Sequence, residues 1–271
     1  MGKRKKLEIV FHVGPHKTAT TSFQSFLSVN TATLLDKGNL VPKWGTSGHH
    51  QLPWAILGFN SNLLGALNVP ADYLIKSMLI QARAFSSHRI ILSSEDFSLL
   101  SIANWIKIKN SIRVNGKKHF KVKTKCVYTV RSTNELQKSM YLELLKHGYS
   151  KSVVDSNSEI WWHIQKVKWR LRFLPFASKV EIAYNAQNHV NLLASVIFND
   201  VTIEELIPPP ARENESIITP TVLEETRKVN QLLELDYPKA IFHWPRSFSM
   251  DSYIKLQEKH RQIISNNRTK G

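Results

Sequence analysis

The sequence predicts an α/β fold with a mostly parallel central sheet flanked by helices. Short runs of β-branched and aromatic residues alternate with longer amphipathic segments, and polar or small residues follow each run. Because parallel strands need crossover connections, this alternation is typical of βαβ units with helices on both faces of the sheet. The 271 residues can bury one large core, so we expect a single domain over 1–271, helical in its C-terminal part from about residue 212.

Each predicted element follows from its local pattern. Buried strands are expected at Leu7–Val13, Arg89–Leu92, Val122–Val130 and Val180–Tyr184. Helices are expected at Thr21–Val29, Ala71–Phe85, Thr133–His147, Glu159–Leu174, Ala186–Phe198, Val222–Leu235 and Asp251–Ile264. The clearest loop signals are Gly45–His50 and the three prolines at 208–210.

The chain is strongly basic. Its 37 Lys and Arg residues against 21 Asp and Glu give a formal net charge of +16. Such a charge attracts phosphate, sulfate, nucleic acid or an anionic membrane surface without choosing among them. No stretch has the length and apolar character of a membrane span or a secretory signal, so we expect a cytoplasmic protein. Peripheral membrane contact through the basic segment Lys3–Lys6 stays open.

The strongest motif runs from the first predicted strand through a tight loop into a helix. Backbone N–H groups at such a helix start favour an anion, and Lys17 adds a point charge suited to a leaving or bridging oxygen. Four hydroxyls add donors, those of Thr18, Thr20, Thr21 and Ser22. No glycine directly precedes Lys17, so the Walker pattern is absent and an ATPase or GTPase is disfavoured. The alternative is a Thr-rich helix cap without a ligand.

This loop resembles a known nucleotide-binding motif. The segment Pro15-His16-Lys17-Thr18-Ala19-Thr20-Thr21 is similar to the 5′-phosphosulfate loop of sulfotransferases that use 3′-phosphoadenosine-5′-phosphosulfate (PAPS), close to the bacterial form His-Lys-Thr-Gly-Thr-Thr. Ala19 stands where the family usually has glycine. The resemblance implies a P-loop nucleotide-kinase-like sulfotransferase fold. It also implies that the donor is bound by His16, Lys17, Thr18, Ala19, Thr20, Thr21 and Ser22.

A second family signature follows the third predicted strand. Arg131 ends that strand, and Ser139 follows eight positions later, about two turns along the next helix. In the family such an Arg and Ser hold the 3′-phosphate, which a guanidinium can grip with two hydrogen bonds. Arg212, after the proline run, resembles a residue that assists this phosphate. The alternative is that Arg131 is an interface charge and Ser139 an ordinary surface residue.

Transfer of a sulfuryl group to a hydroxyl needs a base for the acceptor proton. Glu95 follows the second predicted strand, at the same sheet edge as the two motifs, and resembles the glutamate base of carbohydrate-modifying sulfotransferases. The alternative is structural, with Ser93 or Ser94 capping a helix that begins with Glu95. His50, beside His49 in a glycine-bounded loop, is the rival base, although paired loop histidines are often simply solvated.

These motifs predict a PAPS-dependent sulfotransferase. Lys17, Glu95 and His50 are its candidate catalytic residues, and the acceptor is a hydroxyl of a carbohydrate or glycan. We expect in-line displacement, release of 3′-phosphoadenosine-5′-phosphate, and no metal. Two alternatives stay open: a polyanion (nucleic-acid) binding protein with a degenerate P-loop, and a nucleotide kinase. Nucleic acid is the disfavoured partner. The cations that lie in the two ligand-binding motifs are Lys17 and Arg131, and both motifs indicate a nucleotide donor.

Overall fold

The computed structural model describes residues 4–15, 18–44, 48–58, 69–146, 152–198, 201, 205–208, 224, 227 and 228. The chain divides into two compact units. The first comprises Met1–Arg131 with Val167–Glu213, and the second comprises Ser132–Lys166 with Asn214–Gly271. The expected helix at 251–264, and that at 222–235 apart from residues 224, 227 and 228, lie outside the described residues. A single domain over the whole chain therefore stays a prediction.

The first unit is built on a parallel sheet of five strands. They are β1 (Lys5–Val13), β2 (Asn39–Leu40), β3 (Arg89–Ser93), β4 (Phe120–Val130) and β5 (Ser178–Ala183). Their order in the sheet is β2-β3-β1-β4-β5, and every neighbouring pair is parallel. The predicted fold class, a mostly parallel central sheet flanked by helices, is confirmed.

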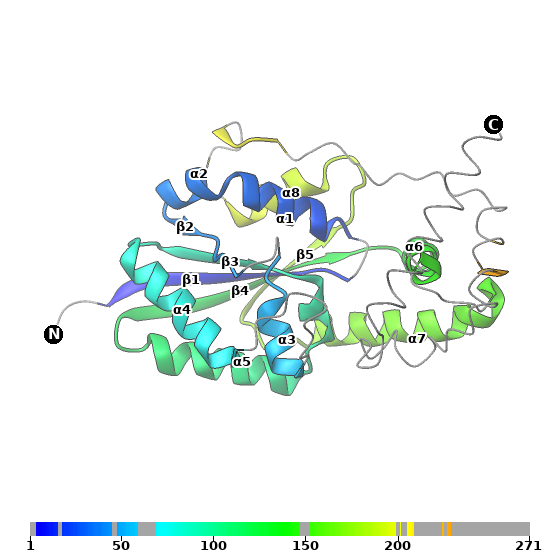
Figure 1. Cartoon of the computed structure of the whole chain (residues 1–271), viewed down its shortest axis with the longest axis horizontal. Coiled ribbons are helices and arrows are strands. Elements are labelled where there is room, and N and C mark those ends of the chain that lie inside the picture. Colours follow the sequence, from blue (N-terminus) through cyan, green and yellow to red (C-terminus); the bar gives the residue numbers. More distant parts are fainter. Residues whose placement is uncertain are drawn as a thin grey trace. The chain divides into compact units, whose positions relative to one another are not determined.

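Helices cover both faces of this sheet (Figure 1). One face carries α1 (Thr20–Val29), α2 (Thr31–Asp36) and α8 (His189–Ile197). The other carries α3 (Gln51–Leu57), α4 (Ala71–Ala84) and α5 (Ile102–Gly116). A short 3₁₀ helix, η2 (Glu95–Leu99), follows β3.

The two faces of the sheet belong to two separate apolar clusters because side chains alternate along a strand. On β1, Ile9 and Phe11 enter one cluster and Val10 enters the other, and all three are fully buried. Phe11 lies within 5.6 Å, between ring centroids, of Phe97, Trp105 and Phe176. This aromatic group fixes η2, and with it the segment after β3, against the sheet.

The second unit contains α6 (Thr133–Lys146) and most of α7 (Val153–Arg172). Its own apolar cluster consists of Leu136, Met140, Tyr141, Leu145, Ile160 and Ile164. The Ser132 hydroxyl accepts from the Glu135 N–H at 3.4 Å and donates to the Glu135 carboxylate at 2.7 Å, so Ser132 caps the start of α6.

Candidate active site

The loops after β1 and β3 meet at one edge of the sheet. His12 and Ser93 are opposite each other in the parallel register, so Gly14 and Glu95, each two residues farther along, follow at the same level. Ligands of open α/β sheets bind at this carboxyl edge. The structure therefore places the first loop and Glu95 together, as the sequence led us to expect.

Gly14 is required by the tight course of the loop. A Cβ at this position would lie 2.5 Å from Oγ1 of Thr18 and 2.9 Å from Oγ1 of Thr20. The buried Thr18 hydroxyl donates to the carbonyl of Pro15 at 2.7 Å. Both threonines thus fold the chain back on Gly14, which brings the start of α1 next to the end of β1.

The start of α1 has the properties of an anion site. Its N-cap residue, Ala19, makes no capping hydrogen bond through its side chain, and the first turn contains no acidic residue. The side chain of Thr20 is 4% exposed, and its Oγ1 has no hydrogen-bond partner among the described residues. An uncapped helix start with a buried, unpartnered hydroxyl leaves several donors for a ligand, where the helix dipole is positive. Thr21 and Ser22 lie in the same first turn.

Ala19 adopts the left-handed backbone conformation, with φ 57° and ψ 24°. Since a Cβ is strained there, Ala19→Gly is expected to raise the free energy of unfolding by about 1 kcal/mol. Thermal unfolding should show this as a gain of about 2–4 °C. Ser86→Gly, at the other described non-glycine residue with positive φ, is the matched control and should give a similar gain. A fall in melting temperature for Ala19→Gly would contradict the left-handed geometry.

Gln24 links α1 to the segment after β3. Its Nε2 donates to Oε2 of Glu95 at 3.1 Å and to the carbonyl of Ser93 at 3.3 Å. Gln24 is four residues after Thr20, so the Glu95 carboxylate lies about one helical turn from the anion site. Ser94 caps η2 by accepting from the N–H of Asp96, so the structural alternative for this segment is present as well. The cap engages Ser94 and leaves the Glu95 side chain 20% exposed.

His50 belongs to this group and is not a solvated loop histidine. Its side chain is 15% exposed, and its Nδ1 lies 2.8 Å from Oδ2 of Asp96, which also accepts from Nε1 of Trp54 at 2.8 Å. The His50 Nε2 lies 3.9 Å from Oε2 of Glu95. Burial disfavours the charged ring, but the hydrogen bond to Asp96 and the charges of Glu95 and Asp96 outweigh burial and raise the pKa of His50. Glu95 thus faces an imidazole whose pKa its own charge helps to raise.

Two buried histidines hold Ser93, the last residue of β3. Nδ1 of His12 lies 2.8 Å from the Ser93 hydroxyl, and Nδ1 of His49 accepts from the Ser93 N–H at 2.9 Å. Since Nδ1 of His49 accepts, its proton is on Nε2, which donates to the Pro42 carbonyl at 2.9 Å. Burial lowers the pKa of His12 to about 3 and that of His49 to about 4, so both rings are neutral.

Arg131 follows the last residue of β4, at the same carboxyl edge. Its guanidinium carbon lies 4.5 Å from the centre of the Tyr184 ring, which stacks against it just after β5. Such stacking orients a guanidinium while leaving its edge able to donate. Ser139 is half-buried on α6, in the second unit.

Three predicted site residues, His16, Lys17 and Arg212, lie outside the described residues. Asp96 was missed from the sequence as a partner of His50. The signal that could have found it is its position beside Glu95, directly after a buried strand. Within the described ranges, no group of three or more His, Cys, Asp or Glu side chains is placed to hold a metal ion. No helix among these residues has the length and apolar character needed to cross a membrane.

Comparison with known proteins gives similarity at the level of fold. No family model matches the sequence, and no curated protein matches it significantly. The chain is similar to the sulfotransferase domain of the Synechococcus PCC 7002 olefin synthase (12% identity, TM-score 0.45, covering 96% of each chain). It is also similar to the sulfotransferase domain of the curacin biosynthetic pathway (12%, 0.42, covering 97% of this chain and 98% of that one). A fungal RNA kinase is similar as well (10%, 0.44, covering 85% and 98%).

Proposed function

We propose that the chain is a sulfotransferase that moves the sulfuryl group of PAPS to a hydroxyl of a carbohydrate or glycan. One observation carries this proposal. The start of α1 is uncapped beside the unpartnered Thr20 hydroxyl, and Gln24 holds the Glu95 carboxylate about one helical turn away. An anion site next to a carboxylate suits the transfer of an anionic group to an acceptor that must lose a proton.

Separate residues bind the donor, neutralise the leaving oxygen and remove the acceptor proton. The first turn of α1, with Thr18 and the hydroxyls of Thr20, Thr21 and Ser22, binds the 5′-phosphosulfate. Lys17 neutralises charge on the bridging oxygen as its bond to sulfur breaks. Glu95 takes the proton of the acceptor hydroxyl as the acceptor oxygen bonds to sulfur. His50, held by Asp96, lies 3.9 Å from the Glu95 carboxylate and orients it.

Arg131 binds the 3′-phosphate of the donor. Its guanidinium lies at the carboxyl end of β4, against the Tyr184 ring, and can bind a phosphate with two parallel hydrogen bonds. Ser139 and Arg212 are carried into this proposal from the sequence motifs alone. The carbohydrate acceptor follows from the glutamate base and the bacterial form of the loop.

Nucleotide binding tests the proposal most directly. Titration calorimetry should show tighter binding of 3′-phosphoadenosine-5′-phosphate than of ATP or AMP. Arg131→Ala should weaken binding of the 3′-phosphorylated nucleotide by about 10- to 100-fold, because one charge-assisted contact is lost. The same change should leave the affinity for AMP, which lacks the 3′-phosphate, within about twofold.

Arg172→Ala is the matched control, since Arg172 is an exposed arginine near the end of α7 in the same unit. It removes the same charge and should leave all three affinities unchanged. Equal affinity for the three nucleotides, or an equal loss with both variants, would remove the 3′-phosphate role of Arg131. Preference for ATP with magnesium would favour a kinase.

Lys17→Ala separates transfer from general binding of polyanions. A sulfotransferase should lose transfer of labelled sulfuryl group, whereas a nucleic-acid binding protein should lose only about one charge's worth of salt-dependent affinity.

A further inference from the structure

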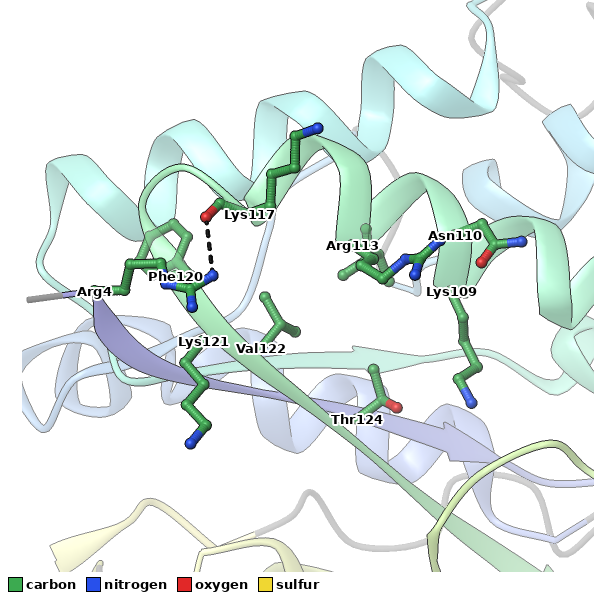
Figure 2. A pocket seen from close by; sticks show the side chains of 10 residues that line it. Arg4, Lys109, Asn110, Arg113, Lys117, Phe120, Lys121, Val122 and Thr124 are labelled. Atoms are coloured by element: carbon green, nitrogen blue, oxygen red, sulfur yellow. Dashed lines mark hydrogen bonds between the residues drawn. The ribbon is translucent and has the colours of Figure 1, made fainter.

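A basic pocket lies beside the first half of β4, in the first unit. Its volume is about 400 Å³, within the range of small-molecule sites. Five of its ten lining residues are cationic, and none is acidic. They are Arg4, Lys109, Arg113, Lys117 and Lys121, and Figure 2 shows them arranged around Phe120 and Val122.

The pocket exists because the sheet is incomplete here. β4 begins at Phe120, but β5 pairs with it only from Lys125 onward. Among the described strands, none pairs with the outer edge of residues 120–124, and α5 forms the wall beside this edge. The floor is apolar, with Ile112, Phe120 and Val122, and the cations form the rim.

The cations that line the pocket come from three separate elements. Lys109, Arg113 and Lys117 follow one another at intervals of four along α5 and its C-cap, so they repel each other along one stripe. Favourable interaction with the helix dipole accounts for Arg113 and Lys117 at the end of α5. It does not account for Arg4 and Lys121, which enter the same pocket from the segment before β1 and from β4.

No carboxylate of the described residues compensates this charge. Arg4 donates to the carbonyl of Lys117 at 3.3 Å, and Lys109 donates to the carbonyl of Pro175. The remaining three cations, Arg113, Lys117 and Lys121, form no side-chain hydrogen bond or ion pair within the described part of the chain. Three uncompensated donors around an apolar floor suit a ligand with anionic groups on an organic body.

The pocket is separate from the candidate active site. Val122 lies eight residues before Val130 on β4, a distance of about 26 Å along the strand at about 3.3 Å per residue. A donor nucleotide bound at Arg131 therefore does not reach this pocket.

We propose that this pocket is a second anion site, which binds a small molecule carrying two or more phosphate or sulfate ester groups. Arg113 binds one group with its planar guanidinium, and Lys121 binds another as a point charge. The apolar floor packs against the body that joins the groups. This proposal does not depend on the sulfotransferase assignment.

Two double variants test it, each lowering the formal net charge of +16 by two. Arg113→Gln/Lys121→Gln removes two rim cations. Lys107→Gln/Lys123→Gln is the matched control, because these exposed lysines belong to the same helix and strand but do not line the pocket. Fructose 1,6-bisphosphate is the phosphate-ester probe, a trisulfated heparin disaccharide is the sulfate-ester probe, and inorganic sulfate serves as the single-anion reference.

Calorimetry should show at least one ester binding more tightly than inorganic sulfate, and the ester that binds identifies the source of the ligand. The rim variant should weaken this binding by about tenfold or more, and the control by less than about twofold. Bound ester should slow amide hydrogen exchange in residues 109–124. Three results would overturn the proposal: no preference over inorganic sulfate, equal losses in both double variants, or displacement of the ester by 3′-phosphoadenosine-5′-phosphate.

Discussion

Glu95→Gln is expected to lower the rate of sulfuryl transfer by about 10²- to 10⁴-fold, the contribution of a positioned general base. Glutamine keeps the shape of the side chain. Its amide oxygen can still accept from Nε2 of Gln24, which donates to Oε2 of Glu95 at 3.1 Å in the wild-type protein. It cannot accept the acceptor's proton. The loss should therefore fall on kcat, with nucleotide affinity within about twofold of wild type.

The measurement is single-turnover transfer from labelled PAPS to N-acetylglucosamine and lactose, with thermal unfolding as the check on folding. His50→Gln is the matched variant, since its ring lies 3.9 Å from the same carboxylate. It should cost about tenfold, because a residue that orients the base contributes less than the base itself. A larger loss with His50→Gln than with Glu95→Gln would assign the proton transfer to His50.

The pH dependence separates the two residues independently. The pKa of His50 is raised by Asp96 and Glu95 against the opposing effect of burial. If His50 were the base, activity would need its neutral form and would rise only above that raised pKa. With Glu95 as base, activity does not require the neutral form of His50, so protonation of His50 should cause no loss of transfer.

β1 and β3 could be predicted because they are largely buried and read as nearly continuous apolar runs. β4 and β5 are partly exposed, and their β-branched and aromatic residues gave the signal. β1, β3, β4 and β5 each match a predicted strand to within two residues at either end. β2 was missed since two residues, Asn39 and Leu40, carry no periodicity. α5 was also missed, although Trp105, Ile108 and Ile112 are spaced as on one helix face, because exposed Ile106 and Val114 interrupt its polar side.

Only one part of the site could be predicted from the sequence, namely that the segments after neighbouring strands lie at the same edge of the sheet. The topology alone brings Gly14 and Glu95 to one edge. The contacts of His50 with Asp96 and of His12 with Ser93 join residues 46 and 81 positions apart, and no local pattern encodes such pairs. The backbone conformation of Ala19, in contrast, could be predicted from the sequence. The motif that the loop resembles usually has glycine at this position, and Ala19 adopts the left-handed conformation that favours glycine.

Acidification from pH 6.5 to pH 5 is expected to destabilise the fold by about 3 kcal/mol through His12 and His49. In the unfolded chain both titrate near the ordinary value of 6.5, whereas burial lowers the pKa of His12 to about 3 and that of His49 to about 4. Below pH 6.5 the unfolded state therefore binds more protons, and each histidine removes up to about 1.4 kcal/mol per pH unit, the limit reached about one pH unit below 6.5. This stabilisation is fully present above pH 6.5 and is lost as the pH falls toward the folded pKa values.

His50 does not offset this loss. Its folded pKa is raised, so its stabilising contribution is complete below the unfolded value and is lost only as the pH rises through the folded pKa. Urea unfolding followed by tryptophan fluorescence at pH 7, 6 and 5 measures the slope of stability against pH. His12→Asn and His49→Gln should each reduce that slope by about 1.4 kcal/mol per pH unit, whatever they cost at neutral pH.

An unchanged slope in His12→Asn or His49→Gln would mean that the ring is protonated in the folded protein. Because both rings contact Ser93, two residues before Glu95, acid should loosen this edge of the sheet. This loosening should lower transfer activity near pH 5 in the wild-type protein, and His49→Gln, if it folds at pH 7, should retain a larger fraction of its neutral-pH activity there.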